Sequence, residues 1–321
     1  MTKRPVLLID GLNVFMRHFV VNPSLNESGL HVGGTVGFLN TIKLLSNRIG
    51  PSRIIIAWEG GGSSRRRAIF KDYKQGKRPQ KLNRYYKDDL PDTVENRGDQ
   101  IGLTIDLLKN TPVEQVYVPD CEADDVIGYL TKHVLKDERI VVASSDKDLY
   151  QLLSKRIIQW SPGQKKFITF RDVKEKFGIS STNFCTARCF VGDSSDGIPG
   201  VPKVGFGSLI KRFPSLSTDK FVSVEDIIEE SKKLIEKAQL VAYTSIIENA
   251  SIAKRNWKLM FLDISNLSED HIRRINFLMD DPSTKLDKLG LIKSLSRHGI
   301  KNFDVDNFFS SIKANLRRTD K

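Results

Sequence analysis

The sequence is poor in the residues that form disulfides and zinc sites. It contains only three cysteines, Cys121, Cys185 and Cys189, and none has a metal-ligand partner nearby. An odd, small number of cysteines argues against a disulfide framework and favours reduced, mostly buried thiols. Its five histidines are scattered along the chain and form no cluster. Neither residue type therefore predicts a zinc site.

Long apolar segments are also missing. No apolar run approaches the ~18 residues of a membrane-spanning helix, and Met1 to Pro5 lead directly into a short strand without a targeting segment. We therefore expect a soluble, intracellular protein located in the cytoplasm. At 321 residues, the chain is long enough for one large α/β domain and a smaller satellite, each with its own core.

Positive charge is in excess and is concentrated in one segment. The formal net charge is +12. Between Gly60 and Asp88, ten basic residues face only two acidic ones, a local balance of +8. Such a segment favours a polyanionic partner, most commonly a nucleic-acid backbone. Taken alone, a charge run is more often a solvated surface.

Three predicted strands are each followed by acidic residues. The strands are residues 6–9, 54–58 and 140–143, and the acidic residues that follow them are Asp10, Glu59, Asp146 and Asp148. Strands that alternate with helices predict a mainly parallel sheet with right-handed crossovers. In such a sheet the ligand site lies beyond the carboxyl ends of the strands, so these acids are expected to converge.

A further acidic group, Glu122, Asp124 and Asp125, opens a predicted helix. Acids are common at helix N-termini, where the macrodipole stabilises them, and for these three alone that explanation stays open. Gathered with the strand-end acids they would repel, at about 4 kcal/mol per close pair for ~4 Å and an effective dielectric near 20. A divalent cation would relieve this repulsion. Oxygen-only ligands suit Mg²⁺ or Mn²⁺ better than zinc.

The order of the acidic motifs resembles the 5′-nuclease (flap endonuclease) superfamily. The motifs are Asp10-Gly11, Glu59 after the second strand, Glu122-Ala123-Asp124-Asp125, Asp146-Lys147-Asp148 and Gly192-Asp193-Ser194-Ser195-Asp196. The resemblance runs from Val6 to about Ile312. Residues 159–166 and 259–264 are most similar to the ribonuclease H and 5′ to 3′ exonuclease group of T-even phages.

The resemblance implies an α/β fold of the PIN-like type, with a mainly parallel central sheet flanked by helices. Residues 1–183 would form the catalytic domain, with a helical arch at about 60–100. Residues 184–321 would form a helical DNA-binding domain, with a helix-three-turn-helix at about 184–213. The implied activity is 5′ to 3′ exonuclease or flap endonuclease cleavage of 5′-flap DNA and RNA–DNA duplexes, as in RNA primer removal. Its products would carry 5′-phosphates.

The resemblance also implies two bound Mg²⁺ ions, for which Mn²⁺ could substitute. One would be held by Asp10, Glu59, Glu122, Asp124 and Asp125, and the other by Asp146, Asp148, Asp193 and Asp196. Among these, Asp146 is expected to be indispensable for cleavage. Glu59 departs from the family, which usually has Asp at this position.

Several cations are expected to contact the substrate because they match family positions. Lys74 and Arg66 would offset charge on the transferring phosphoryl group. The remaining expected DNA contacts are Arg17, Arg78, Lys203 and Lys211, together with the turn residues Gly200 and Gly205. Gly207 stands where the family usually has Lys, so Lys203 or Lys211 would have to replace it.

Two alternatives stay open at this point. The chain could be a PIN-like ribonuclease for single-stranded RNA, or a non-catalytic protein that binds branched DNA. In the interpretation that the motifs favour, its partners are DNA with a 5′ flap, nick or fork and RNA–DNA hybrids. A single-stranded-DNA-binding protein or a sliding clamp are candidate replication partners. We expect a monomer, located in the host cytoplasm if a phage encodes it.

Overall fold

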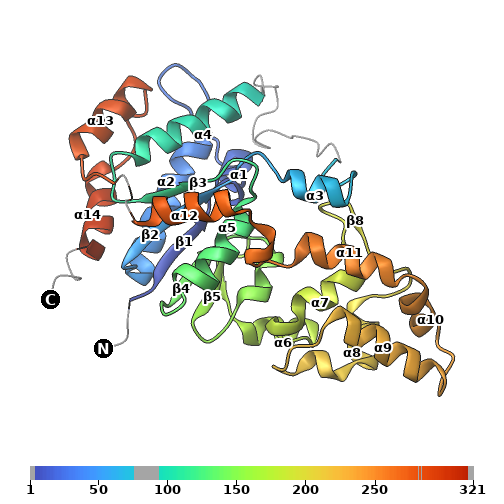
Figure 1. The fold of residues 1–321 in the computed structure, drawn as a ribbon. Helices are drawn as coiled ribbons and strands as arrows, with labels where there is room; N and C mark the ends of the chain where they lie inside the picture. Colours follow the sequence, from blue (N-terminus) through green and yellow to red (C-terminus); the bar gives the residue numbers. More distant parts are fainter. Residues whose placement is uncertain (1–3, 76–93, 281, 283, 317–321) are drawn as a thin grey trace.

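The computed structural model describes residues 4–75, 94–280, 282 and 284–316 (Figure 1). Residues 76–93 of the expected arch, which include Arg78, lie outside these ranges. A six-stranded sheet with the order β3-β2-β1-β4-β5-β6 forms the centre. Only β6 runs antiparallel, to β5, so the predicted mainly parallel sheet is confirmed. The strands are β1 (Val6–Asp10), β2 (Arg53–Trp58), β3 (Glu114–Tyr117), β4 (Ile140–Ala143), β5 (Ile157–Ser161) and β6 (Lys166–Ile168).

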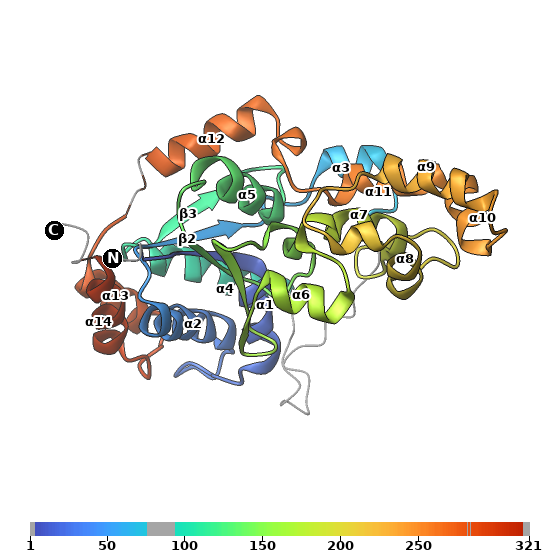
Figure 2. The ribbon, with the colours of Figure 1, turned by 90° about the horizontal axis from the view of Figure 1, so that it is seen from below.

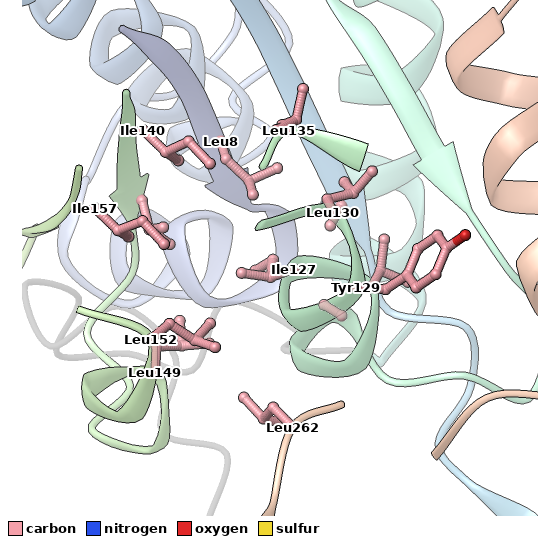
Figure 3. Packing of buried hydrophobic residues seen from close by; sticks show 14 of the residues in the cluster. Leu8, Ile127, Tyr129, Leu130, Leu135, Ile140, Leu149, Leu152, Ile157 and Leu262 are labelled. Atoms are coloured by element: carbon pink, nitrogen blue, oxygen red, sulfur yellow. The ribbon is translucent and has the colours of Figure 1, made fainter. Parts of the chain in front are cut away.

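The central strands are apolar because helices cover both faces of the sheet. Every residue of β1 is buried, as expected for a parallel strand enclosed on two sides. Alternate side chains serve opposite faces: Leu8 packs with Ile127 of α5 on one face, whereas Leu7 packs with Phe38 of α2 on the other. Figure 3 shows the first of these faces, where Leu8 and Ile140 point toward the helix carrying Ile127.

Residues 4–177 supply the sheet and most of the helices that flank it (Figure 2). One face is covered chiefly by α1, α2 and α4, and the other by α5 and the π-helical turn η1. The bounds in this part are α1 (Gly11–Val21), α2 (Gly33–Ile49), α3 (Ser64–Ile69), α4 (Val94–Leu108), α5 (Ala123–Tyr129), η1 (Leu130–Val134), η2 (Asp148–Leu152) and α6 (Phe170–Phe177).

Residues 181–260 form a helical unit beside the sheet, with its own buried core. In Figure 1 this unit lies at the opposite side of the molecule from α13 and α14. Its elements are α7 (Ser181–Val191), β7 (Gly192–Asp193), β8 (Ile198–Pro199), α8 (Phe206–Arg212), η3 (Pro214–Ser217), α9 (Val224–Ile235), α10 (Val241–Glu248) and α11 (Ala250–Met260). The helices expected on either side of the Gly- and Pro-rich turn are therefore present.

The last helices return to the sheet, which differs from the single C-terminal domain expected for residues 184–321. Leu262, Ile275 and Met279 join the core beneath α5, and Arg274 of α12 donates a 2.8 Å hydrogen bond to the Tyr117 carbonyl of β3. Leu291 packs on the opposite face, with α2 and α4. The elements concerned are η4 (Ile264–Asn266), α12 (Glu269–Asp280), α13 (Lys288–Arg297) and α14 (Val305–Leu316). Amphipathic helices can bury their apolar faces against either unit, so the sequence alone does not reveal this return.

Two smaller expectations concern the cysteines and the membrane. All three cysteines are buried and free, as predicted. None of the helices in the described ranges combines the length and apolar composition needed to cross a bilayer.

Candidate metal centre

The carboxyl ends of β1 and β4 are linked by side chains that hold Asp10 in place. Asp10 ends β1 and caps α1, where its Oδ1 accepts a 3.2 Å hydrogen bond from the Asn13 amide. Its Oδ2 accepts a 2.8 Å hydrogen bond from the hydroxyl of Ser144, which follows β4. The same hydroxyl accepts a 3.0 Å bond from the Asp146 amide. Asp10 and Asp146 thus belong to one network, as the neighbouring strands predict.

Glu59 and the acids of α5 meet at the next strand end. Oε2 of Glu59 accepts a 3.2 Å hydrogen bond from the Ala123 amide, the first residue of α5. Glu122 precedes that residue and is only 2 % exposed. Because β2 lies beside β1 in the sheet, the acids following both strands face one edge of the molecule, as expected.

Asp148, Asp193 and Asp196 come together although they belong to different parts of the chain. Each contributes one carboxylate oxygen to a group in which all these atoms lie within 4.8 Å of one another. Asp148 begins η2, and its amide donates a 2.8 Å hydrogen bond to Asp146. Asp193 lies in β7, at the end of α7. The helical unit therefore brings part of the acidic set to the sheet.

Arg188 is a residue of this site that sequence reasoning missed. It lies on α7, and its guanidinium donates hydrogen bonds to Asp148 and to Asp193. Its Nη1 also donates a 3.0 Å bond to the Gly192 carbonyl. The only available signal was a single basic residue on an otherwise uncharged helix, five positions before Asp193.

Arg66 occupies a position that differs from the expected phosphate contact. Its side chain is 2 % exposed and bonds both oxygens of Asp125. It also pairs with Glu122 at 3.2 Å and donates a 2.7 Å hydrogen bond from Nε to the Leu259 carbonyl of α11. Because its donors are used inside the protein, Arg66 holds the acids in place and is not available to a phosphate in this arrangement. Asp125 is correspondingly engaged, with a further 3.1 Å bond from Asn266.

Lys74 and Tyr73 border the acidic cluster from the segment after α3. The Lys74 ammonium lies 3.0 Å from Glu122 and 3.8 Å from Asp196, and its side chain is 36 % exposed. The Tyr73 hydroxyl donates a 2.8 Å hydrogen bond to Glu122. The Lys74 amide also donates to the Asp196 carbonyl at 3.0 Å. Of the two predicted catalytic cations, Lys74 is thus the one with access to solvent.

The pKa values of the acidic cluster are shifted because its carboxyl groups are buried close to one another. Burial raises the pKa values of Asp10 and Asp148 to about 7, and neighbouring carboxylates add to the effect. The pKa of Asp124 lies well above its usual range because it is buried among other acids. Burial raises the pKa values of Glu59 and Asp196 as well. Without a counter-charge, the cluster therefore resists full ionisation.

Glu122 provides a direct test of whether a cation fits. Burial opposes its ionisation, but Arg66 and Lys74 hold its pKa below the usual value. Its Oε2 receives all the hydrogen bonds described above, whereas Oε1 is buried and has no partner among the residues that the structure describes. An orphaned carboxylate oxygen within an oxygen-only donor set is what a hard divalent cation requires. The residues present therefore fit such a cation.

The other expected DNA contacts lie at the surface or in turns. Arg17, Lys203 and Lys211 are exposed. A Cβ atom at Gly200 would lie 2.2 Å from the Val191 carbonyl oxygen, so this close approach of two backbone segments requires glycine. Gly205 precedes α8. The roles of these residues in DNA binding stay predictions.

Comparison with known proteins places this geometry in a family. A family profile described as the 5′-3′ exonuclease N-terminal resolvase-like domain matches residues 5–178. The 5′-3′ exonuclease of Buchnera aphidicola (subsp. Acyrthosiphon pisum) is 28% identical over 314 residues, which cover 96% of this chain and 98% of that protein. Flap endonuclease Xni of Shewanella woodyi is 30% identical over 239 residues, covering 73% and 88%. DNA polymerase I of Bacillus subtilis is 32% identical over 248 residues, but only 26% of that protein is covered.

Solved structures show the same fold. A bacteriophage T5 protein co-crystallised with metal ions superimposes with a TM-score of 0.68 at 19% identity, covering 86% of this chain and 98% of that chain. The T5 flap endonuclease in a pseudo-enzyme–product complex with DNA and metal ions gives 0.65 at 18% identity, covering 98% and 99%. The chain is therefore a nuclease of the 5′-3′ exonuclease family, as the order of its acidic motifs predicted.

Proposed function

We propose that this nuclease is a Mg²⁺-dependent 5′ to 3′ exonuclease and flap endonuclease that hydrolyses phosphodiesters in 5′-flap DNA and RNA–DNA duplexes. The observation that carries the proposal is the convergence, at one edge of the sheet, of carboxylates that lie in β1, α5 and β7 or shortly after β4. Names of relatives, including flap endonuclease Xni, support the substrate class.

The cation ligands that we propose form two neighbouring sets. Asp10, Glu59, Glu122 and Asp124 would hold one ion, and Asp146, Asp148, Asp193 and Asp196 the other. Asp125 is left out because Arg66 already engages both of its oxygens. Bound divalent ions supply Lewis-acid stabilisation of the scissile phosphate and lower the pKa of the attacking water.

The chain's own groups position the substrate and balance its charge. Lys74 is a partly exposed cation at the rim of the cluster, and a phosphate placed there would be neutralised as charge develops during cleavage. Tyr73 stays protonated because burial raises its pKa, and its hydroxyl fixes the Glu122 carboxylate. The exposed Arg17, Lys203 and Lys211 would bind duplex phosphates and position the strand.

A single-strand ribonuclease is less well supported, because it has little need of the helix-turn-helix formed by α7, β7, β8 and α8. A purely binding protein is disfavoured by the retained carboxylates, which repel a polyanion. The expected single-stranded-DNA-binding protein and sliding clamp partners, and the monomeric state, stay predictions.

The test is cleavage of a 5′-labelled flap duplex by the Asp146→Asn variant, with and without Mg²⁺. We expect this variant to lose Mg²⁺-dependent cleavage while binding of the flap duplex stays measurable. Asp270→Asn is the matched control, because Asp270 is an exposed carboxylate on α12 that pairs with the exposed Arg273. Normal turnover by Asp146→Asn would refute the site. Equal cleavage of single-stranded RNA and of the flap duplex by the wild type would refute the substrate class.

A further inference from the structure

The loop of residues 144–146, which follows β4, brings Asp146 to the acidic cluster. The Ser145 amide donates a 2.9 Å hydrogen bond to Oδ1 of Asn13 on α1, so the outer side of the loop is attached to that helix. Asp146 uses its own Oδ1 to accept the 2.8 Å bond from the Asp148 amide. Because the side chain is oriented locally in this way, the position of the loop backbone decides where the Asp146 carboxylate lies.

Gln159 holds the backbone of this loop from the inside of the protein. It lies on β5, the strand beside β4, and its side chain is fully buried. Its Nε2 atom donates a 2.8 Å hydrogen bond to the Ser144 carbonyl and a second one, also of 2.8 Å, to the Asp146 carbonyl. A side-chain amide has two N–H donors, and both are used here. One side chain therefore spans the loop from its first residue to its last.

Packing alone does not explain a glutamine at this position. Its Oε1 atom is buried and has no hydrogen-bond partner among the residues that the structure describes, which opposes folding. Alternate residues of a strand share one face of the sheet, and Ile157, two positions earlier, packs in the core beside α5. An apolar side chain at position 159 would avoid the unpaired oxygen but could not bond the loop. What the amide provides is the pair of bonds to the two carbonyl groups.

We propose that Gln159 is a positioning residue for the cleavage reaction, which sets the place of the Asp146 carboxylate through the loop backbone and takes no part in the chemistry itself. This inference rests on the proposed function, in which Asp146 is a cation ligand. Groups that orient metal ligands alter metal affinity although they do not touch the ion. The Ser144 hydroxyl extends the effect, because it donates to Asp10 and accepts from the Asp146 amide. A displaced loop would therefore disturb the acids that follow both strands.

The first experiment measures Mn²⁺ binding to the full-length protein by electron paramagnetic resonance, without nucleic acid. Gln159→Met keeps an unbranched side chain of similar length and removes both donors. We expect it to weaken, by about 10- to 100-fold, the Mn²⁺ binding step that Asp146→Asn abolishes. In cleavage assays, the Mg²⁺ concentration that gives half of the maximal rate should rise by a similar factor, whereas the rate at saturating Mg²⁺ should return toward that of the wild type.

Gln100→Met is the matched control, which separates positioning from a general loss of stability. Gln100 is also a buried glutamine, 3% exposed, and its Nε2 atom donates a 2.7 Å hydrogen bond to the His31 carbonyl. Its hydrogen bonds join α4 to the start of α2. The urea midpoint should fall in both variants, but Mn²⁺ binding by Gln100→Met should change by less than about twofold. An equal loss of Mn²⁺ affinity in the two variants, or unchanged affinity in Gln159→Met, would overturn the proposal.

A measurement on the wild type decides the matter even if Gln159→Met does not fold. The side-chain amide NMR signals of Gln159 should shift on saturation with Mg²⁺, because its Nε2 atom bonds the carbonyl of Asp146. The corresponding signals of Gln100 should stay in place. Equal shifts for the two glutamines, or no shift for Gln159, would contradict the positioning role.

These outcomes also separate this inference from the proposed function. If Gln159→Met binds Mn²⁺ more weakly than the wild type, but the wild type does not cleave a flap duplex, the proposed function fails and the positioning of Asp146 stands. If the wild type cleaves the flap duplex and Gln159→Met binds Mn²⁺ as tightly as the wild type, only the role of Gln159 fails.

Discussion

Arg188 donates two hydrogen bonds to the same oxygen of Asp148, from Nε at 3.1 Å and from Nη2 at 2.9 Å. The Nη2 atom also contacts Asp193, so one guanidinium holds together two acids of the group formed by Asp148, Asp193 and Asp196. A divalent ion requires the same oxygens. Arg188 should therefore stabilise the cation-free protein and weaken cation binding.

Replacing Arg188 by Met should separate these two effects. We expect the free energy of unfolding without divalent ions to fall by about 3 kcal/mol, because two partly buried carboxylates lose their partner. Binding of Mn²⁺, followed by electron paramagnetic resonance, should tighten by at least about tenfold. Arg273→Met, which removes an exposed arginine from α12, should change neither quantity. Weaker Mn²⁺ binding by Arg188→Met would show that the arginine organises the ligands instead of competing for them.

Arg66 is predicted to support the fold more than it contacts substrate. Because it is buried and paired with Asp125 and Glu122, Arg66→Met should lower the free energy of unfolding by about 3 to 5 kcal/mol. Arg67→Met, which removes an arginine that is 47% exposed and lies 3.6 Å from Asp120, should cost less than about 1 kcal/mol. Urea unfolding measures both. An unchanged stability of Arg66→Met, combined with lost cleavage, would restore Arg66 to the catalytic residues.

The pH dependence of stability should reveal the raised pKa of Asp10. Its pKa in the folded, cation-free protein is about 7, above the ordinary 3.8. Between pH 3.8 and pH 7 the Asp10 carboxyl is therefore protonated in the folded state and ionised in the unfolded state. The stability contributed by the protonated form is complete below about pH 4 and is lost as pH rises toward 7. His18 acts in the opposite direction, because burial lowers its pKa to about 4.

His18 contributes equally to the stability of the wild type and of Asp10→Asn, so its contribution cancels when the two stabilities are subtracted. The thermal stability of Asp10→Asn relative to wild type should therefore rise between pH 5 and pH 8 in EDTA. Saturating Mg²⁺ should reduce this advantage, because a cation favours the ionised carboxylate of the wild type. A difference that stays constant with pH would show that Asp10 has an ordinary pKa.

Gly207 offers a way to strengthen the grip on duplex DNA. It lies on α8, is exposed, and a Cβ atom placed there meets nothing within 4 Å. Gly207→Lys should therefore fold normally, tighten duplex binding, and steepen the logarithmic salt dependence by about one unit through one added phosphate contact. Gly102→Lys is the control, since Gly102 is also exposed, helical and unobstructed. An equal gain in both variants would indicate a general charge effect.

The sequence predicted the sheet and the acids because both depend on local patterns. Buried parallel strands are continuous apolar runs, and a residue such as Asp10 that follows one must lie at the carboxyl edge. The partners of Arg66 and Arg188 could not be predicted in this way. Arg66 meets an acid 59 residues away and Arg188 one 40 residues away, and no periodicity in the chain specifies such pairs.

The bond from Arg66 to the Leu259 carbonyl has a mechanical consequence. The Nε atom of the guanidinium bonds α11, in the unit expected to grip duplex, and its Nη atoms contact the acids Glu122 and Asp125. A tilt of α11 on a bound duplex would pull on those acids through a single rigid, planar group. The position of the bound duplex and the distances between the carboxylates therefore depend on each other.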